Sequence, residues 1–343
     1  MKTLLTISGP TASGKSGLAV RVAKELDGEI VNLDSVQIYK EFDIGSAKIT
    51  AEEMDNVPHH LIDIKEPTEQ CNVSEIVELA KSSIAEIHAR GKQVIVVCGT
   101  GMYLKHLLYG LAELPERDES LRAELEARNL DELYSELQNV DPKTAARLHP
   151  NDKVRIVRAL EVYHLSGTAI SESQADHDFG ALNYTSLNLV LCWARHLLYD
   201  RINQRVDLML EHGLIEEVKQ IVKRHGRDLP ALKTLGYAQA IDFIDSVLDF
   251  EQLREQIAQE TRRFAKRQMT FWRNQPLALG WKMAPKQGEG EWLKSEDLLE
   301  KAQKTVKDFY VKSHNYPELL EFIRFELDRI AISEALYLNA ASL

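Results

Sequence analysis

Eight residues near the N-terminus have the spacing of a phosphate-binding loop. Residues 9–16, GPTASGKS, match the pattern G-x-x-x-x-G-K-[ST]. In such a loop the glycines let successive backbone N–H groups turn toward an anion, and the following helix N-terminus adds positive potential. Lys15 supplies a positive charge to phosphate oxygens, and the Ser16 hydroxyl can hold Mg²⁺. The pattern predicts a site for a di- or triphosphate, but it does not say which bond of that ligand breaks.

Two further side chains follow apolar runs of strand length. Asp34 comes after Glu29–Leu33, and Thr100 comes shortly after Val94–Val97. Ligands bind at the carboxyl edge of an open parallel sheet, so both side chains can face the bound phosphate. A carboxylate there could act as a general base toward an incoming nucleophile. From position alone, a turn or helix-cap aspartate and an ordinary turn threonine are equally good interpretations.

The third apolar run lacks the acid with which many P-loop NTPases hold a metal ion. It ends in Cys98-Gly99, and no N-K-x-D guanine-specificity motif occurs in the chain. We therefore expect no Walker-B metal site at this strand.

These motifs lie in an alternation of predicted strands and helices. The runs Leu4–Ile7, Glu29–Leu33 and Val94–Val97 predict strands, with helices predicted over Ser16–Leu26 and from Asn72 to about Arg90. Strands alternating with helices imply right-handed crossovers and a parallel sheet with buried strands. We predict an α/β fold with a P-loop NTPase-like parallel sheet core flanked by helices.

The pattern changes near Leu114-Pro115. Residues 118–166 show only helical periodicity, and the apolar run Leu187–Trp193 then returns the chain to the sheet, followed by helices to about Arg273. We predict a discontinuous core of residues 1–114 and 183–310, an all-helical insertion domain of residues 115–182, and a helical tail of residues 311–343. The tail has the pattern of an acidic amphipathic helix and receives no role.

The composition of the chain predicts the class of protein and its cellular compartment. The 343 residues are 44% hydrophobic and 28% charged, as in a globular protein, and no apolar run approaches the ~18 residues of a membrane span. The N-terminus lacks the features of a secretory signal. Three widely spaced cysteines exclude a disulfide framework and fit a reducing cytosol, so we expect a cytoplasmic protein without membrane partners.

Basic residues gather locally although the formal net charge is −11. One cluster contains Arg262, Arg263, Lys266, Arg267 and Arg273, and a second contains Arg147, Lys153, Arg155 and Arg158. In a helix, Arg263, Lys266 and Arg267 would share a face. Each cluster alone is typical of a solvated helix face, but two of them beside a phosphate site favour an RNA ligand.

Several further blocks occur in a fixed order along the chain. They are Asp34-Ser-Val-Gln37 with Tyr39, Asp43-Ile-Gly-Ser-Ala-Lys48, Pro58-His-His-Leu-Ile-Asp63, Gly99-Thr-Gly-Met-Tyr103, His149-Pro-Asn-Asp152, Arg155, Arg158-Ala-Leu-Glu161, Gly236-Tyr237 and Ala265-Lys-Arg-Gln268. Together with the phosphate-binding loop, and over about residues 1–310, the chain resembles the bacterial tRNA dimethylallyltransferases, also called tRNA isopentenyltransferases.

The resemblance implies a reaction and its partners. The dimethylallyl group of dimethylallyl diphosphate moves to N6 of the adenine next to the anticodon, position 37 of a tRNA, and diphosphate leaves. The loop then holds a departing diphosphate, not ATP, and Mg²⁺ accompanies the diphosphate. We expect a monomer that binds the tRNA anticodon stem-loop. Asp34 matches the position that accepts the N6 proton, and Thr100 matches one that contacts the target nucleotide; we predict both as catalytic residues.

The resemblance also assigns the remaining site residues. Diphosphate binding falls to Gly9, Pro10, Thr11, Ala12, Ser13, Gly14, Lys15 and Ser16. The tRNA contacts fall to Asp34, Ser35, Val36, Gln37, Thr100, Arg122, Val154, Arg155, Ile156, Val157, Arg158, Lys233, Thr234, Leu235, Gly236, Tyr237 and Ala238. To these we add Arg263, Lys266 and Arg267 from the first basic cluster. The helical insertion is thereby expected to contact tRNA.

Two residues depart from the family pattern, and three alternatives remain. Cys98 stands where the family usually has a glycine, and Ala238 where a Lys or Arg is frequent. A P-loop small-molecule kinase would use Asp34 as the base for an alcohol and would consume ATP. A close relative would prenylate free adenine nucleotides, whereas a non-catalytic, nucleotide-gated RNA-binding protein would form no product.

Overall fold

Short apolar runs that end in glycine or polar residues form the strands of the sheet, because such runs can be buried on both faces. The computed structural model describes residues 3–110, 114–176, 183–273, 278–283 and 290–293, and the stretch 317–328 except 318 and 322. In the first part of the chain the elements are β1 (Leu4–Ser8), α1 (Lys15–Glu25), β2 (Gly28–Leu33), α2 (Ala51–Met54), β3 (His59–His60), α3 (Val73–Ala89), β4 (Gln93–Cys98) and α4 (Gly101–Tyr109).

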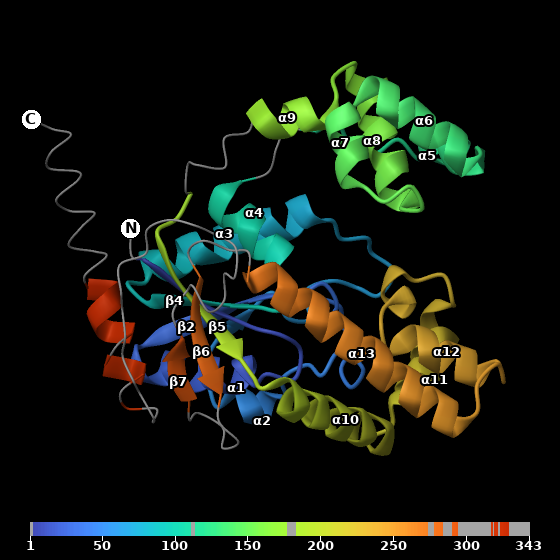
Figure 1. Ribbon diagram of the computed structural model, residues 1–343. Helices are drawn as coiled ribbons and strands as arrows, with labels where there is room; N and C mark the ends of the chain where they lie inside the picture. Colours follow the sequence, from blue (N-terminus) through green and yellow to red (C-terminus); the bar gives the residue numbers. More distant parts are fainter. Residues whose placement is uncertain are drawn as a thin grey trace, which may run out of the picture. The chain divides into compact units, whose positions relative to one another are not determined.

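After the insertion the chain returns to the sheet. It forms β5 (Ser186–Cys192), α10 (Arg195–Glu211), α11 (Leu214–His225), the 3-10 helix η1 (Pro230–Lys233), α12 (Tyr237–Ile244), α13 (Phe250–Arg273), β6 (Ala278–Met283) and β7 (Gly290–Leu293). The described strands form one sheet in the order β3-β2-β4-β1-β5-β6-β7, and all neighbours are parallel except β6 and β7 (Figure 1). The predicted α/β fold with a parallel sheet is confirmed.

The two faces of the sheet bury alternate residues of each strand. Leu5 and Ile7 of β1 and Leu189 and Leu191 of β5 belong to one apolar cluster with Leu18 of α1. On β2 and β4 the sheet also contacts α3, whose Ile76, Ile84 and neighbours are buried. Because the strands are parallel, the loops after β1, β2, β4 and β5 all leave from the same edge of the sheet.

Residues 109–183 form a compact unit with a core of its own. Its described helices are α5 (Glu119–Ala127), α6 (Leu130–Val140), α7 (Pro142–Arg147), α8 (Lys153–Ser166) and α9 (Ile170–Asp176). Leu125, Leu133, Leu137 and Leu160 are fully or almost fully buried between these helices. Side chains of Asp118, Asn129, Asp141 and Asp152 accept backbone N–H bonds at the helix starts, which explains why the unit divides at these residues.

Two stretches differ from expectation. The sequence predicted no strand at His59–His60, where a two-residue strand pairs with β2, nor the strands β6 and β7. The predicted tail helix of residues 311–343 lies mostly outside the described residues. Those described between 317 and 328 are helical, and Leu319, Leu320 and Ile323 are buried in the same cluster as Leu18. Among the described residues, no helix combines the length and apolarity needed to cross a membrane.

Candidate functional site

The phosphate-binding loop connects β1 to α1 at the carboxyl edge of the sheet. Gly14 precedes the helix in the left-handed conformation, with φ of +86°, which glycine adopts without steric cost. The Trp193 indole donates to the Ser13 carbonyl at 3.0 Å, and Arg201 Nε donates to the Ala12 carbonyl at 2.8 Å. The Arg201 guanidinium also lies over the Trp193 ring, 4.6 Å from its centroid. Two side chains that follow β5 therefore fix the loop backbone from one side.

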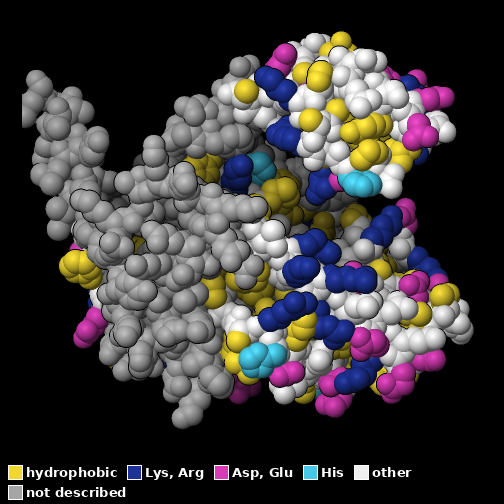
Figure 2. All heavy atoms as spheres, in the orientation of Figure 1, with side chains coloured by type: hydrophobic (Ala, Val, Ile, Leu, Met, Phe, Trp, Pro, Cys, Tyr) yellow, Lys and Arg dark blue, Asp and Glu magenta, His cyan; other side chains and the backbone are white. Residues whose placement is uncertain are grey.

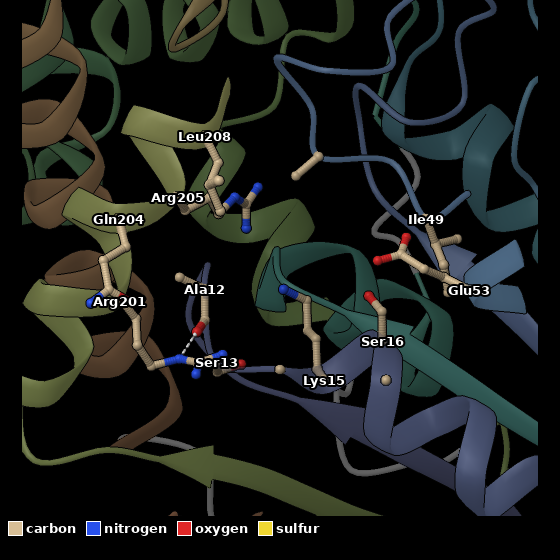
Figure 3. Close-up of a pocket in the computed structure, with 13 residues that line it drawn as sticks. Ala12, Ser13, Lys15, Ser16, Ile49, Glu53, Arg201, Gln204, Arg205 and Leu208 are labelled. Atoms are coloured by element: carbon tan, nitrogen blue, oxygen red, sulfur yellow. Dashed lines mark hydrogen bonds between the residues drawn. The ribbon is translucent and has the colours of Figure 1, made fainter. Parts of the chain in front are cut away.

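Two adjoining cavities open at this loop. One, of about 520 Å³, is lined by loop residues 12–17, by Ile49 and Glu53, and by α10 (Figure 3). Figure 3 shows Lys15 and Ser16 between Arg205 on one wall and Glu53 on the other. The second cavity, of about 340 Å³, has walls from the loops after β2 and β4 and from α10 and α13. Lys15, Ser16, Ala47 and Arg205 line both cavities.

Positive charge is concentrated where the cavities meet. Burial lowers the pKa of Lys15, and the nearby Arg205 lowers it further, while Asp34 and Cys98 act in the opposite direction. Burial likewise lowers the pKa of Arg205 to about 10, against the attraction of Asp34. Two cations in a desolvated place repel one another, so an anion with two or more charges would relieve an unfavourable arrangement. The junction is therefore suited to a diphosphate.

Asp34 and Thr100 both line the second cavity, together with Lys15. Asp34 Oδ1 accepts hydrogen bonds from the backbone N–H groups of Val36 at 2.9 Å and Gln37 at 3.2 Å. The aspartate thus closes a turn and also presents a carboxylate to a cavity. The structure brings it into the same cavity as the predicted phosphate lysine, as the sequence analysis expected.

Gln268 of α13 joins two of the loops at this edge. Its Oε1 accepts from Thr11 N at 2.9 Å, and its Nε2 donates to the Gly99 carbonyl at 2.8 Å. Gln268 is buried, and Arg205 Nη1 donates to the Thr11 hydroxyl at 3.2 Å. One amide therefore fixes the distance between the phosphate-binding loop and the loop that carries Thr100.

Cys98 packs beneath the site. Its side chain is fully buried, and its Sγ–H donates to the Thr100 carbonyl at 3.1 Å. Burial raises the pKa of the thiol to about 12. The departure from glycine is therefore accommodated by packing, and Cys98 lines neither cavity.

A magnesium ion would fit this site if Ser16 and the substrate phosphates held it together. Ser16 lines both cavities, and no group of three or more His, Cys, Asp or Glu side chains suitable for a metal occurs among the described residues. Mg²⁺ keeps several waters and binds mainly through substrate phosphates with few protein ligands, so this polar junction is compatible with it.

Some predicted residues lie away from the cavities. Gly9 and Pro10 line neither of them; the Pro10 carbonyl accepts from Ser13 N at 3.2 Å and shapes the turn. The other predicted diphosphate residues, 11–16, line at least one cavity. Among the predicted tRNA residues, Ser35, Val36, Gln37, Thr234, Leu235, Gly236, Tyr237 and Arg267 line the second cavity, whereas Lys233, Ala238, Arg263 and Lys266 do not.

Three predicted tRNA contacts need correction. The side chains of Ile156 and Val157 are fully buried in the core of the helical unit, so they cannot reach an RNA in this conformation. Tyr237 is also fully buried, and its hydroxyl is bonded to protein groups on both sides. We assign Tyr237 to the support of the cavity wall. A sequence block that contacts RNA as a whole still needs apolar residues to hold its helix, and the sequence alone did not separate the two.

The remaining predicted residues of the helical unit differ in exposure. Val154 and Arg155 are exposed at the start of α8, where Arg155 pairs with Asp152. Arg122 pairs with Glu126 at 2.9 Å. Arg158 donates to Glu161 at 2.8 Å and to the Pro115 carbonyl at 2.9 Å, so it anchors the start of the unit.

Sequence reasoning missed Arg201, Arg205 and Gln268. The two arginines stand four residues apart, so they share a face of α10, and this like-charge spacing was the available signal. Gln268 was part of a quoted block but received no role. Their partners Thr11, Ala12 and Gly99 lie more than 150 residues away in the chain, and no local pattern specifies such contacts.

The fold and the cavities define a P-loop α/β protein that can hold a diphosphate beside a carboxylate. A family model described as IPP transferase matches residues 37–275. The chain is 45% identical to tRNA dimethylallyltransferase 1 of Citrifermentans bemidjiense, over 78% of this chain and 88% of that protein. It is 44% identical to a tRNA dimethylallyltransferase of Anoxybacillus flavithermus, over 79% of this chain and 88% of that protein.

Solved structures agree. The full-length tRNA isopentenylpyrophosphate transferase of Bacillus halodurans matches with a TM-score of 0.68 and 36% identity, over 98% of this chain and all of that one. A eukaryotic dimethylallyltransferase acting on tRNA matches with a TM-score of 0.71 and 29% identity, over 82% of this chain and 74% of that one. The chain belongs to the IPP transferase family.

Proposed function

We propose that this protein transfers the dimethylallyl group of dimethylallyl diphosphate to N6 of adenine 37, beside the anticodon of a tRNA, and releases diphosphate. The observation that carries this proposal is the junction of the two cavities. Lys15 and Arg205 are shared by both, and Asp34 and Thr100 stand in the second cavity beside them. A leaving diphosphate and an attacking amine need this combination of cations and a base.

The cations have a defined part in the reaction. As the allylic C–O bond breaks, negative charge grows on the diphosphate, and Lys15, Arg205 and the loop N–H groups would stabilise it. Mg²⁺, held with the help of the Ser16 hydroxyl, would supply further charge neutralisation on the same oxygens. Because the loop is fixed by Trp193 and Arg201, these groups would need little rearrangement when the charge appears.

The second cavity has an apolar side for the dimethylallyl group. Ile202 and Val206 of α10 and Ile257 of α13 line it and are otherwise buried. A five-carbon chain placed there would be shielded from water, which would otherwise compete with the adenine for the allylic carbon. Asp34 would take the N6 proton as the C–N bond forms, and Thr100 would contact the base.

An adenine in an anticodon loop must leave the stack to enter such a cavity. Figure 2 shows Lys and Arg side chains gathered over the region of α13, and Arg267 of this helix lines the second cavity. Lys266 and Arg263 are exposed on the same helix. We propose that these cations hold the tRNA backbone while the adenine is inserted. We also propose that the protein acts as a monomer and meets its tRNA in the cytoplasm.

The decisive experiment incubates the protein with dimethylallyl diphosphate, Mg²⁺ and unmodified tRNA. Nucleoside mass spectrometry should find one adenosine per tRNA carrying an added five-carbon unit, without ATP. A parallel reaction with free adenine nucleotides should give little product. Transfer of labelled terminal phosphate from ATP to an acceptor, with the tRNA unchanged, would instead establish the kinase alternative. tRNA binding without any product would establish the RNA-binding alternative.

A further inference from the structure

One stretch of loop contributes to the walls of both cavities mainly through its backbone. Gly45, Ser46 and Ala47 line the second cavity, and Ala47 also lines the first. We call residues 43–47 the 43–47 loop. Its importance lies in its carbonyl groups: Gln37 Nε2 donates to those of Ser46 at 3.0 Å and Ala47 at 3.2 Å. Arg205 Nη2 also donates to the Ser46 carbonyl, at 3.5 Å. The loop therefore sets where the Arg205 guanidinium and the Gln37 amide stand.

A single carboxylate holds this loop from behind. Glu217 of α11 accepts hydrogen bonds from the backbone N–H groups of Asp43 at 3.1 Å, Ile44 at 2.7 Å and Gly45 at 3.1 Å. The next N–H, that of Ser46, donates to the Tyr237 hydroxyl at 3.1 Å. That hydroxyl in turn donates to Glu217 Oε1 at 2.8 Å. Four successive N–H groups thus end on one pair of side chains, and bonds to a charged acceptor are the stronger kind.

Close packing makes the arrangement specific. A Cβ on Gly45 would lie 2.5 Å from Tyr237 Cζ and 2.8 Å from Leu214 Cδ1, so only glycine lets the loop approach this closely. The Phe42 ring packs against the Tyr237 ring with centroids 4.9 Å apart. Burial raises the pKa of Tyr237, so its hydroxyl stays protonated and keeps donating to Glu217 at working pH.

We propose that Glu217, acting with Tyr237, is a positioning residue for the diphosphate donor: it holds the 43–47 loop where Ser46 keeps Arg205 aimed at the phosphate junction. This inference rests on the proposed function and adds to it a pair of side chains on α11 and α12 that act through the 43–47 loop. It also gives a use to the block Asp43–Lys48, to which the sequence analysis assigned none.

The test compares Glu217→Gln with Glu216→Gln. In Glu217→Gln the side-chain NH₂ takes the place of one carboxylate oxygen and faces N–H or O–H donors. At least one hydrogen bond to residue 217 is therefore lost, and the two donors repel each other. Glu216 is the matched control, because its carboxylate bonds Gln220 on the exposed surface of the same helix. We expect Glu217→Gln to raise the KM for dimethylallyl diphosphate and the inhibition constant of inorganic diphosphate about 10-fold. The KM for tRNA should change less than about twofold, and Glu216→Gln should match the wild type.

A double-mutant cycle separates positioning from general structural support. If Glu217 acts through Arg205, then Arg205→Lys should raise the KM for the donor by a smaller factor in the Glu217→Gln background than in the wild type. A role confined to stability would give additive effects on the KM for the donor. Thermal unfolding curves of all variants are measured first, and the assays are run at a temperature at which every variant is folded. Should Glu217→Gln not fold, Tyr237→Phe takes its place, because it removes one hydroxyl and keeps the ring.

The outcomes are distinct. Unchanged diphosphate affinity in a folded variant, an equal rise in the KM for tRNA, or an additive cycle would overturn the inference. Diphosphate affinity is measured by calorimetry without tRNA. If the wild type makes no prenylated adenosine, the proposed function fails, and calorimetry still decides whether Glu217 controls diphosphate binding.

Discussion

The Asp34 carboxylate has two jobs that a substitution can separate. Oδ1 closes the turn over Val36 and Gln37, while the group also lines the second cavity. Asparagine keeps an oxygen acceptor for the turn but is not a base. We expect Asp34→Asn to lower the single-turnover rate by about 10²-fold or more, with tRNA and diphosphate binding nearly unchanged. Asp34→Ala should lower the rate to the same extent and should also lower the free energy of unfolding by about 0.5–2 kcal/mol. A folded Asp34→Asn protein with a near-normal rate would exclude Asp34 as the base.

Lys15 predicts a pH effect whose direction follows from its surroundings. Burial and Arg205 lower its pKa from the ordinary value of 10.5, and the protonated form is the one that attracts diphosphate. As pH rises through the lowered pKa, the charge is lost, so kcat/KM for the donor should fall at a pH below 10.5. The measurement is a pH profile with saturating tRNA. In Lys15→Arg the guanidinium stays charged, and the decline should move to higher pH; an unchanged decline would assign it to another group.

Local patterns predicted most of the elements but few of the contacts between them. Strands β1, β2, β4 and β5 and helices α1 and α3 follow from apolar runs and caps, because these signals are local. His59–His60 pairs at an edge through two residues only, too short to leave a pattern. The phosphate loop and Asp34 were visible because each stands directly after a strand. Glu217 was not visible: it resembles any charged residue of an amphipathic helix until its partners, 172–174 residues away, are known.

Helix α13 gives a test of such long-range contacts. Gln268 bonds both Thr11 N and the Gly99 carbonyl, and it is buried. Gln268→Ala should leave the partly buried Thr11 N–H and the buried Gly99 carbonyl without their partner and lower stability by about 1–3 kcal/mol. It should also raise the KM for the donor, because the two loops would no longer keep their spacing. Gln259→Ala, at an exposed position of the same helix, is the control for helix propensity. Equal donor KM values in the two variants would contradict this role of Gln268.

The C-terminal helical stretch, which the family resemblance did not cover, belongs to the core of its unit. Leu319, Leu320 and Ile323 pack in the cluster that contains Leu18, and Arg324 Nη2 donates to the Glu25 carbonyl at 3.1 Å. These contacts cover α1, the helix that starts at the phosphate loop. Ile323→Ala should therefore destabilise the protein by about 2–5 kcal/mol, measured by denaturant unfolding. Phe325→Ala, at an exposed position, should cost far less. Equal costs would mean that the stretch is not docked in solution.

Charge distribution over the whole chain, rather than its sum, should govern tRNA binding. The formal net charge of −11 opposes an RNA, so affinity must come from local cations and should fall steeply with salt. Lys266 is exposed on α13, and Arg155 is exposed in the helical unit. We expect Lys266→Gln and Arg155→Gln each to reduce the slope of log K against log salt by about 1, while the KM for the donor stays constant. Arg227 is the control, because it lies outside both basic clusters and its two Nη atoms bind Asp245. A wild-type affinity that does not change with salt would show that phosphate contacts do not hold the tRNA.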